Sequence, residues 1–156
     1  MELPLNMLSV LQKRIAVPSL LAMLVVATAL AGCQQQGSSE GTKTIQVDGG
    51  SFVDVMPSVL NTMLQKKDFL LVNVHVPYDG EIADTDLFIP YDRIEQNLTS
   101  LPKDKNARIV LYCLSGHMGA EAAQTLVRLG YADVWNLHGG MAQWRNDGYL
   151  LLQKAQ

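Results

Sequence analysis

The chain has 156 residues, a formal net charge of -3 at pH 7 and only two cysteines, Cys33 and Cys113. This balance argues against nucleic-acid binding, which calls for a basic surface, and no basic stripe with interleaved aromatic residues is present. The length allows one compact domain behind a targeting segment, but not two.

The first 32 residues have the pattern of a signal peptide. Lys13 and Arg14 precede an apolar stretch over residues 15–31, which ends in the small residues of Leu30-Ala31-Gly32-Cys33. This end resembles the lipobox of bacterial lipoproteins, in which the cysteine receives a diacylglyceryl thioether and becomes the mature N-terminus. The resemblance implies that Cys33 is lipidated and that the protein is exported and anchored to a membrane of the bacterial cell envelope. The alternatives are an uncleaved membrane anchor and a fortuitous match to the lipobox.

A flexible tether is expected after the signal peptide, over residues 33–43. Behind Cys33, the stretch QQQGSSEGTK is polar, contains Gly and Ser, and offers no apolar residue to bury. We therefore expect a single folded domain over residues 44–156.

Within this domain, helical and strand patterns alternate. Short continuous apolar runs are typical of buried parallel strands, whereas apolar residues three and four apart indicate helices. The first expected element is a helix with Val59, Leu60, Met63 and Leu64 on one face. A strand over 69–74, a short helix over 92–98 and a central strand over 108–112 follow. The last expected elements are a helix over 119–129 closed by Gly130, a strand over 133–137, and a helix over 140–146 with Trp144 inward. This alternation predicts a parallel sheet with helices on both faces.

Cys113 lies between the central strand and the helix that follows it. Free N-H groups at the start of a helix, together with the helix dipole, favour an anion such as a thiolate, which is the nucleophilic form of cysteine. If Cys33 carries lipid, Cys113 has no partner for an internal disulfide. A free cysteine is also often just a small buried apolar residue, so both interpretations stay open at this point.

Two motifs resemble those of a known family. YCLSGHMG carries a cysteine at a strand end with Gly116 three residues on, and VWNLHGGMAQW carries a strand followed by Gly139, Gly140, Met141 and Trp144. In this order and spacing they make residues 44–156 resemble a single rhodanese-like domain. The resemblance implies an α/β, three-layer fold with a mostly parallel central sheet of about five strands and helices on both faces.

The resemblance also implies a sulfurtransferase. Cys113 would take a sulfane sulfur from a donor, hold it as a persulfide and pass it to a nucleophilic acceptor. The backbone N-H groups of the loop would stabilise the sulfur anion, and the substrate-binding residues would be Leu114, Ser115, Gly116, His117 and Met118. The expected ligands are a small sulfur-containing anion and a low-molecular-weight thiol, with an envelope protein as a further partner and no metal or organic cofactor.

Several residues depart from the pattern of the family. Asn73 and His75 stand where many members have Asp and Arg, and Glu81 replaces the His of a Gly-His-Ile motif. Leu114 and Met118 occupy loop positions where active sulfurtransferases often carry a cation. These departures favour the alternative of a non-catalytic rhodanese-like module that binds or senses a ligand.

The remaining polar residues are three histidines and an acidic loop. His117 is either a pocket residue or a solvated side chain. His75 is expected to make a structural hydrogen bond to a loop carbonyl, with a place in the pocket as the alternative, and His138 is expected to be structural. The acidic loop with Glu81, Asp84, Asp86 and Asp92 is expected to be solvated. A cysteine phosphatase is rejected, because its phosphate-clamping arginine would fall at Gly119.

Overall fold

The computed structural model describes residues 40–153. The predicted signal peptide and Cys33 lie outside these described residues. Of the helices within residues 40–153, none is both long and apolar enough to cross a membrane.

Six strands form one sheet in the order β1-β2-β6-β5-β3-β4. They are β1 (Thr42–Val47), β2 (Gly50–Val55), β3 (Leu70–Asn73), β4 (Leu87–Phe88), β5 (Ile109–Tyr112) and β6 (Val134–Leu137). Neighbouring strands are parallel except for the antiparallel pair of β1 and β2. The predicted α/β fold with a mostly parallel sheet is thereby confirmed.

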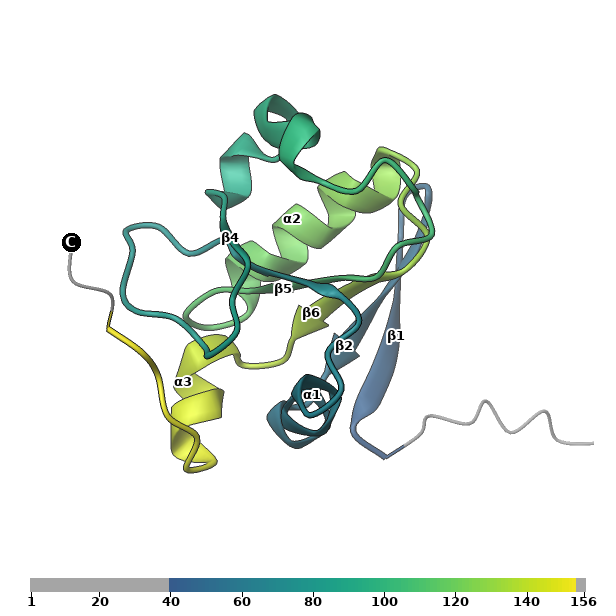
Figure 1. The fold of residues 1–156 in the computed structure, drawn as a ribbon. Helices are drawn as coiled ribbons and strands as arrows, with labels where there is room; N and C mark the ends of the chain where they lie inside the picture. The colour runs from purple at the N-terminus through teal and green to yellow at the C-terminus, as the bar shows by residue number, and fades with distance from the viewer. Residues whose placement is uncertain (1–39, 154–156) are drawn as a thin grey trace, which may run out of the picture. The chain divides into compact units, whose positions relative to one another are not determined.

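Within residues 40–153, α-helices cover both faces of this sheet (Figure 1). The helix α2 (His117–Arg128) packs on one face, whereas α1 (Pro57–Leu64) and α3 (Gly140–Asn146) contact each other on the opposite face. Because side chains alternate along a strand, β5 contributes side chains to the hydrophobic cores on both faces of the sheet. Ile109 and Leu111 join the core under α2, and Val110 and Tyr112 join the core that includes Trp144. Trp144 points inward, as predicted.

The sequence analysis missed the hairpin formed by β1 and β2. Its two-residue turn is Asp48-Gly49, with Gly49 at a positive φ of 86°. β1 begins at Thr42, so the last two residues of the expected tether belong to the sheet, and the sheet has six strands where about five were expected. An Asp-Gly pair between alternating residues is a hairpin signal that could have revealed these strands.

The predicted helix over residues 92–98 is wrong. Two short 3₁₀ segments stand there, η1 (Tyr91–Arg93) and η2 (Glu95–Ser100). Asn97 leaves the helical region at φ -113° and ψ 21°, and its side chain donates to the carbonyl oxygen of Arg93 at 2.8 Å. Such side-chain bonds to the backbone compete with the regular helix ladder.

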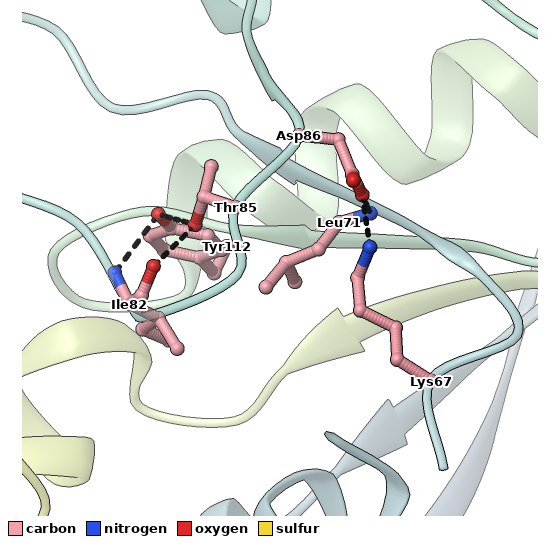
Figure 2. A network of polar contacts seen from close by, with 6 residues as sticks. All are labelled: Lys67, Leu71, Ile82, Thr85, Asp86 and Tyr112. Atoms are coloured by element: carbon pink, nitrogen blue, oxygen red, sulfur yellow. Dashed lines mark hydrogen bonds and ion pairs between the residues drawn. The ribbon is translucent and has the colours of Figure 1, made fainter. Parts of the chain in front are cut away.

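A polar network joins the loop after β3 to the central strands (Figure 2). The Tyr112 hydroxyl accepts the N-H of Ile82 at 3.1 Å and contacts the Thr85 hydroxyl at 2.7 Å, and Thr85 donates to the carbonyl of Ile82. Since the Thr85 proton is used in that bond, Tyr112 donates to Thr85. Burial raises the pKa of Tyr112 well above its ordinary value, which keeps this hydroxyl protonated.

The expected solvation of the acidic loop is wrong for two of its residues. The Asp86 carboxylate accepts the N-H of Leu71 at 2.7 Å and pairs with Lys67 at 2.5 Å (Figure 2). Glu81 is buried, and its backbone pairs with Leu152 in an isolated antiparallel bridge. The loop is therefore tied to the sheet, and it supports the strand that leads to Cys113.

Candidate functional site around Cys113

Cys113 directly follows β5, at the carboxyl edge of the parallel strands. Its side chain lies on the same face as Ile109 and Leu111, below the first turn of α2, and the residue is 1% exposed. The N-H of Gly116 donates a hydrogen bond to the Cys113 Sγ at 3.1 Å. The loop therefore folds back over the thiol and directs a backbone N-H group at it, an arrangement that suits an anionic sulfur.

Two glycines make this loop geometry possible. Gly116, which precedes α2, has a φ of 88°, and a Cβ there would lie 3.1 Å from the backbone of Leu137 and Gly139. Gly140 begins α3 at a φ of 58°, and a Cβ there would lie 2.2 Å from the carbonyl oxygen of Cys113. Each position thus combines a left-handed backbone with close approach to another segment, and both demands favour glycine.

The Gly-Gly motif also supplies the contacts that hold the loop. The N-H of Met141 donates to the carbonyl of Cys113 at 2.8 Å, and the N-H of Ala142 donates to the carbonyl of Leu114 at 2.9 Å. First-turn N-H groups of a helix have no partner within the helix, so α3 satisfies its own donors while fixing the loop. The two motifs found in the sequence therefore form one structural unit.

A pocket with a volume of about 420 Å³ opens beside the loop. Its lining comes from the loop, from α2 and from the neighbouring strands: Ile45, Phe52, Asp54, Ser115, Gly116, His117, Ala120, Asn136, His138 and Gly139. Three of the predicted substrate-binding residues thus come together, namely Ser115, Gly116 and His117. Leu114 and Met118 do not line this pocket, because they pack against the two cores on opposite faces of the sheet.

Three polar residues that the sequence analysis did not connect meet at the pocket. Asp54 on β2 lies opposite Asn136 on β6, and the Asn136 amide donates to Asp54 at 2.8 Å. The second carboxylate oxygen of Asp54 lies 2.7 Å from Nδ1 of His138. The sequence analysis does not predict β2, so it has no basis for placing Asp54 beside His138. The register of β2 and β6 brings these two residues together.

Asn73 and His75, which depart from the family pattern, do not line the pocket beside the Cys113 loop. The Asn73 side chain donates to the carbonyl of Gly80 at 3.0 Å and accepts the N-H of His75 at 3.0 Å, so it shapes the loop after the strand. His75 is buried, and its Nδ1 has no hydrogen-bond partner within residues 40–153. Nδ1 therefore does not make the expected bond to a loop carbonyl.

The pocket lacks the fixed positive charge that a strong anion-binding site would have among its described lining residues. No Lys or Arg lines it among the described residues, and its one carboxylate is Asp54. His117 is exposed and lies 3.4 Å from Glu121, so its ring faces a carboxylate as well as the pocket. Recognition of an anion at this loop must therefore rely on backbone N-H groups and the α2 dipole.

Comparison with known proteins assigns this fold to one family. A family model described as a rhodanese-like domain matches residues 56–147, which is more than half of the chain. The chain belongs to the rhodanese-like domain family. The match includes the Cys113 loop and the Gly139-Gly140 motif.

Individual relatives agree with this assignment. A sulfurtransferase of Allochromatium vinosum is 33% identical over 94 residues, which cover 58% of this chain and 85% of that protein. MoeZ of Mycobacterium tuberculosis, named as a probable adenylyltransferase/sulfurtransferase, is 35% identical over 78 residues, 47% of this chain but only 19% of MoeZ. The crystal structure of a rhodanese-like domain protein from Staphylococcus aureus has a TM-score of 0.56 and 29% identity, and the match covers 65% of this chain and 98% of that one.

Proposed function

We propose that this protein is a thiol-dependent sulfurtransferase in which Cys113 carries a sulfane sulfur as a persulfide. The observation that carries the proposal is the hydrogen bond from Gly116 N-H to the Cys113 Sγ, made by a loop at the start of a helix. The same bond stabilises a thiolate before the reaction and the Cys113 thiolate that leaves in the second step. The sulfurtransferase named above, which aligns over most of its own length, adds support.

In the first step, the Cys113 thiolate attacks the outer sulfur of a donor. With thiosulfate, a Cys113 S-S bond forms, the bond between the two donor sulfurs breaks, and its electron pair leaves with sulfite. The product on the protein is a persulfide. This is nucleophilic catalysis through a covalent intermediate, and it uses no oxidant.

In the second step, a nucleophilic acceptor attacks the outer sulfur of that persulfide. The bond between Cys113 Sγ and the outer sulfur breaks, and its electron pair returns to Cys113 as a thiolate. A low-molecular-weight thiol leaves with the extra sulfur, and cyanide would leave as thiocyanate. The cycle then begins again.

An assay of sulfur transfer from thiosulfate to cyanide tests this proposal. Wild type should form thiocyanate slowly, because no fixed cation holds the dianionic donor, and Cys113→Ser should form none. Because other donors carry less charge than thiosulfate, the assay should be repeated with an organic persulfide. If Cys113→Ser equals wild type with every donor, the enzymatic proposal fails.

A non-catalytic binding module is the second candidate. It is favoured by the burial of Cys113, which is 1% exposed, and by the lack of Lys and Arg in the described pocket lining. A module of this kind would bind a small sulfur compound or an envelope protein without turnover. Binding of thiosulfate by both wild type and Cys113→Ser, with no thiocyanate from either, would support it.

We further propose that Cys33 is lipidated and tethers the domain to the cell envelope. The support for this is the sequence alone, in which an apolar segment ends in Leu30-Ala31-Gly32-Cys33 and a polar stretch follows. The lipid would hold the domain at a membrane surface, where its donor and acceptor would be exported sulfur compounds.

A further inference from the structure

The pocket beside the loop contains a pair of groups suited to proton transfer. Nδ1 of His138 lies 2.7 Å from a carboxylate oxygen of Asp54. An ionised carboxylate only accepts hydrogen bonds, so Nδ1 carries the proton in neutral His138 and Nε2 keeps a lone pair. The His138 side chain is 56% exposed and the Asp54 side chain 16% exposed, so the histidine is accessible while the carboxylate that orients it is largely covered.

Asp54 is itself held in place. The amide of Asn136 donates to its other oxygen at 2.8 Å, and Asn136 is buried at the register position opposite Asp54. The N-H of His138 donates to the carbonyl of Val55 at 2.8 Å, which fixes the backbone of the histidine against β2. The Asp54 carboxylate and the backbone of His138 are therefore held by contacts between two paired strands.

The same pocket reaches the loop that holds the Cys113 sulfur. Ser115, Gly116 and His117 line it together with Asp54 and His138, and Gly116 is the residue whose N-H contacts Sγ. Persulfide formation lengthens the Cys113 side chain by one S-S bond of about 2 Å. A volume of about 420 Å³ is in the range of small-molecule sites. The pocket therefore has the size and the position for an acceptor.

We propose that this pocket binds the acceptor thiol and that His138, oriented by Asp54, removes its proton. The inference rests on the proposed function. The persulfide anion left by the donor step first takes up a proton from solvent. The thiol proton of the acceptor then passes to Nε2 of His138, and the thiol sulfur forms a bond to the outer sulfur of the persulfide. The bond from that sulfur to Cys113 Sγ breaks with its electron pair left on Sγ. The products are a small persulfide, the Cys113 thiolate and protonated His138, which returns its proton to solvent. His138 is the catalytic residue of this step and Asp54 is a positioning residue.

The lining also indicates which thiols fit. Ile45, Phe52 and Ala120 provide an apolar side, and Asp54 is the single charged carboxylate among the described lining residues. A neutral or amine-bearing thiol meets no repulsion there, whereas an acidic thiol faces Asp54. The acceptor class is therefore a small thiol without a negative charge.

The test separates the two steps of the cycle. The protein is first loaded with sulfur on Cys113, freed of donor and mixed with 2-mercaptoethanol, and the loss of the outer sulfur is followed by intact mass spectrometry. Near neutral pH a free thiol is mostly protonated, since its reference pKa is about 8.5. His138→Gln should then slow transfer by about a hundredfold, the lower end of the usual effect of a general base.

Two readouts distinguish this role from a structural one. The defect of His138→Gln should shrink as the pH rises, because the thiol then ionises without help, and transfer to sulfite should be unchanged, because sulfite attacks without losing a thiol proton. Asp54→Asn should also slow transfer to 2-mercaptoethanol, since an amide can donate to Nδ1 and move the ring proton to Nε2. Its transfer to sulfite should not fall, because the variant loses the carboxylate that repels an anion. Asp48→Asn, the same change on the exposed β1-β2 turn, should behave as wild type.

The outcomes that contradict the role of His138 differ from the outcome that contradicts sulfur transfer by Cys113. Equal slowing with sulfite and 2-mercaptoethanol, a defect independent of pH, or no slowing in either variant would each refute the role of His138 while leaving sulfur transfer by Cys113 intact. If wild type takes up no sulfur on Cys113, the proposed function fails and this inference fails with it. Should His138→Gln not fold, Asp54→Asn decides the question alone.

Discussion

The N-H of Met141 donates a hydrogen bond to the carbonyl oxygen of Cys113 at 2.8 Å. This bond links the cysteine loop to the start of α3, and it forms only because Gly140 allows the two backbones to approach. The cysteine motif and the Gly-Gly motif, which are separated by more than twenty residues, are thus two sides of one contact.

Gly140→Ala should break this contact. The left-handed backbone alone costs a residue with a Cβ about 1–2 kcal/mol, and the new Cβ would also overlap the carbonyl oxygen of Cys113. We expect the free energy of unfolding in urea to fall by more than about 2 kcal/mol. Gly148→Ala is the matched control, because Gly148 has a φ of 88° but a Cβ added there would meet no atom within 4 Å. Equal losses in the two variants would contradict the role assigned to the contact.

Tyr112→Phe should destabilise the domain without touching the Cys113 loop directly. The change leaves the buried N-H of Ile82 without its acceptor, which costs about 1–3 kcal/mol of unfolding free energy. Tyr149→Phe is the control, since the Tyr149 hydroxyl makes no hydrogen bond within the described part of the chain. A Tyr112→Phe variant as stable as this control would refute the structural role of the network.

The same residue predicts a pH dependence of stability. Burial raises the pKa of Tyr112 in the folded state above its unfolded value of about 10, so the unfolded state loses this proton first as the pH rises. The stabilisation is complete below about pH 10 and is lost above it. Unfolding free energies measured in alkaline buffers should fall more steeply for wild type than for Tyr112→Phe, and parallel curves would argue against the assignment.

Single residues show which parts of the fold and of the site can be predicted from the sequence. Cys113 and the Gly139-Gly140 motif were placed correctly, because continuous apolar runs and helical spacing identify β5, α2 and β6 without tertiary information. The contact between Asp54 and His138 cannot be predicted from local sequence, because it depends on the parallel pairing of β2 with β6 across more than eighty residues. The helix predicted over residues 92–98 is wrong for a local reason, since the hydrogen bond from the Asn97 side chain to the Arg93 carbonyl competes with the helical hydrogen bonds.

Met118→Arg should improve the use of thiosulfate. Met118 lies in the first turn of α2, where the family often carries a cation. Its side chain packs against the core, so an arginine there must extend along that surface to bring its guanidinium to the loop. One charge-assisted contact made there contributes roughly 1.5–3 kcal/mol, or about ten- to a hundredfold in affinity. The KM for thiosulfate should fall in this variant and stay unchanged in Met118→Leu, which keeps the volume without the charge. If the KM for thiosulfate is the same in Met118→Arg and Met118→Leu, a cation at this position does not contribute to donor binding.

Cys33→Ser should abolish lipidation and leave the precursor unprocessed. Radiolabelled fatty acid fed to cells should enter wild type and Cys113→Ser equally, since only the first cysteine lies in the lipobox-like segment. Label in Cys33→Ser at the wild-type level would show that the assignment of Cys33 is wrong.

The central claim is that Cys113 accepts and holds a sulfur atom, and intact mass spectrometry tests it most directly. After incubation of the soluble domain with thiosulfate or a polysulfide, wild type should gain the mass of one sulfur atom, and cyanide should remove it. Cys113→Ser should gain nothing under the same conditions. A wild-type domain that gains no sulfur from either donor, or a gain that persists in Cys113→Ser, would contradict the account.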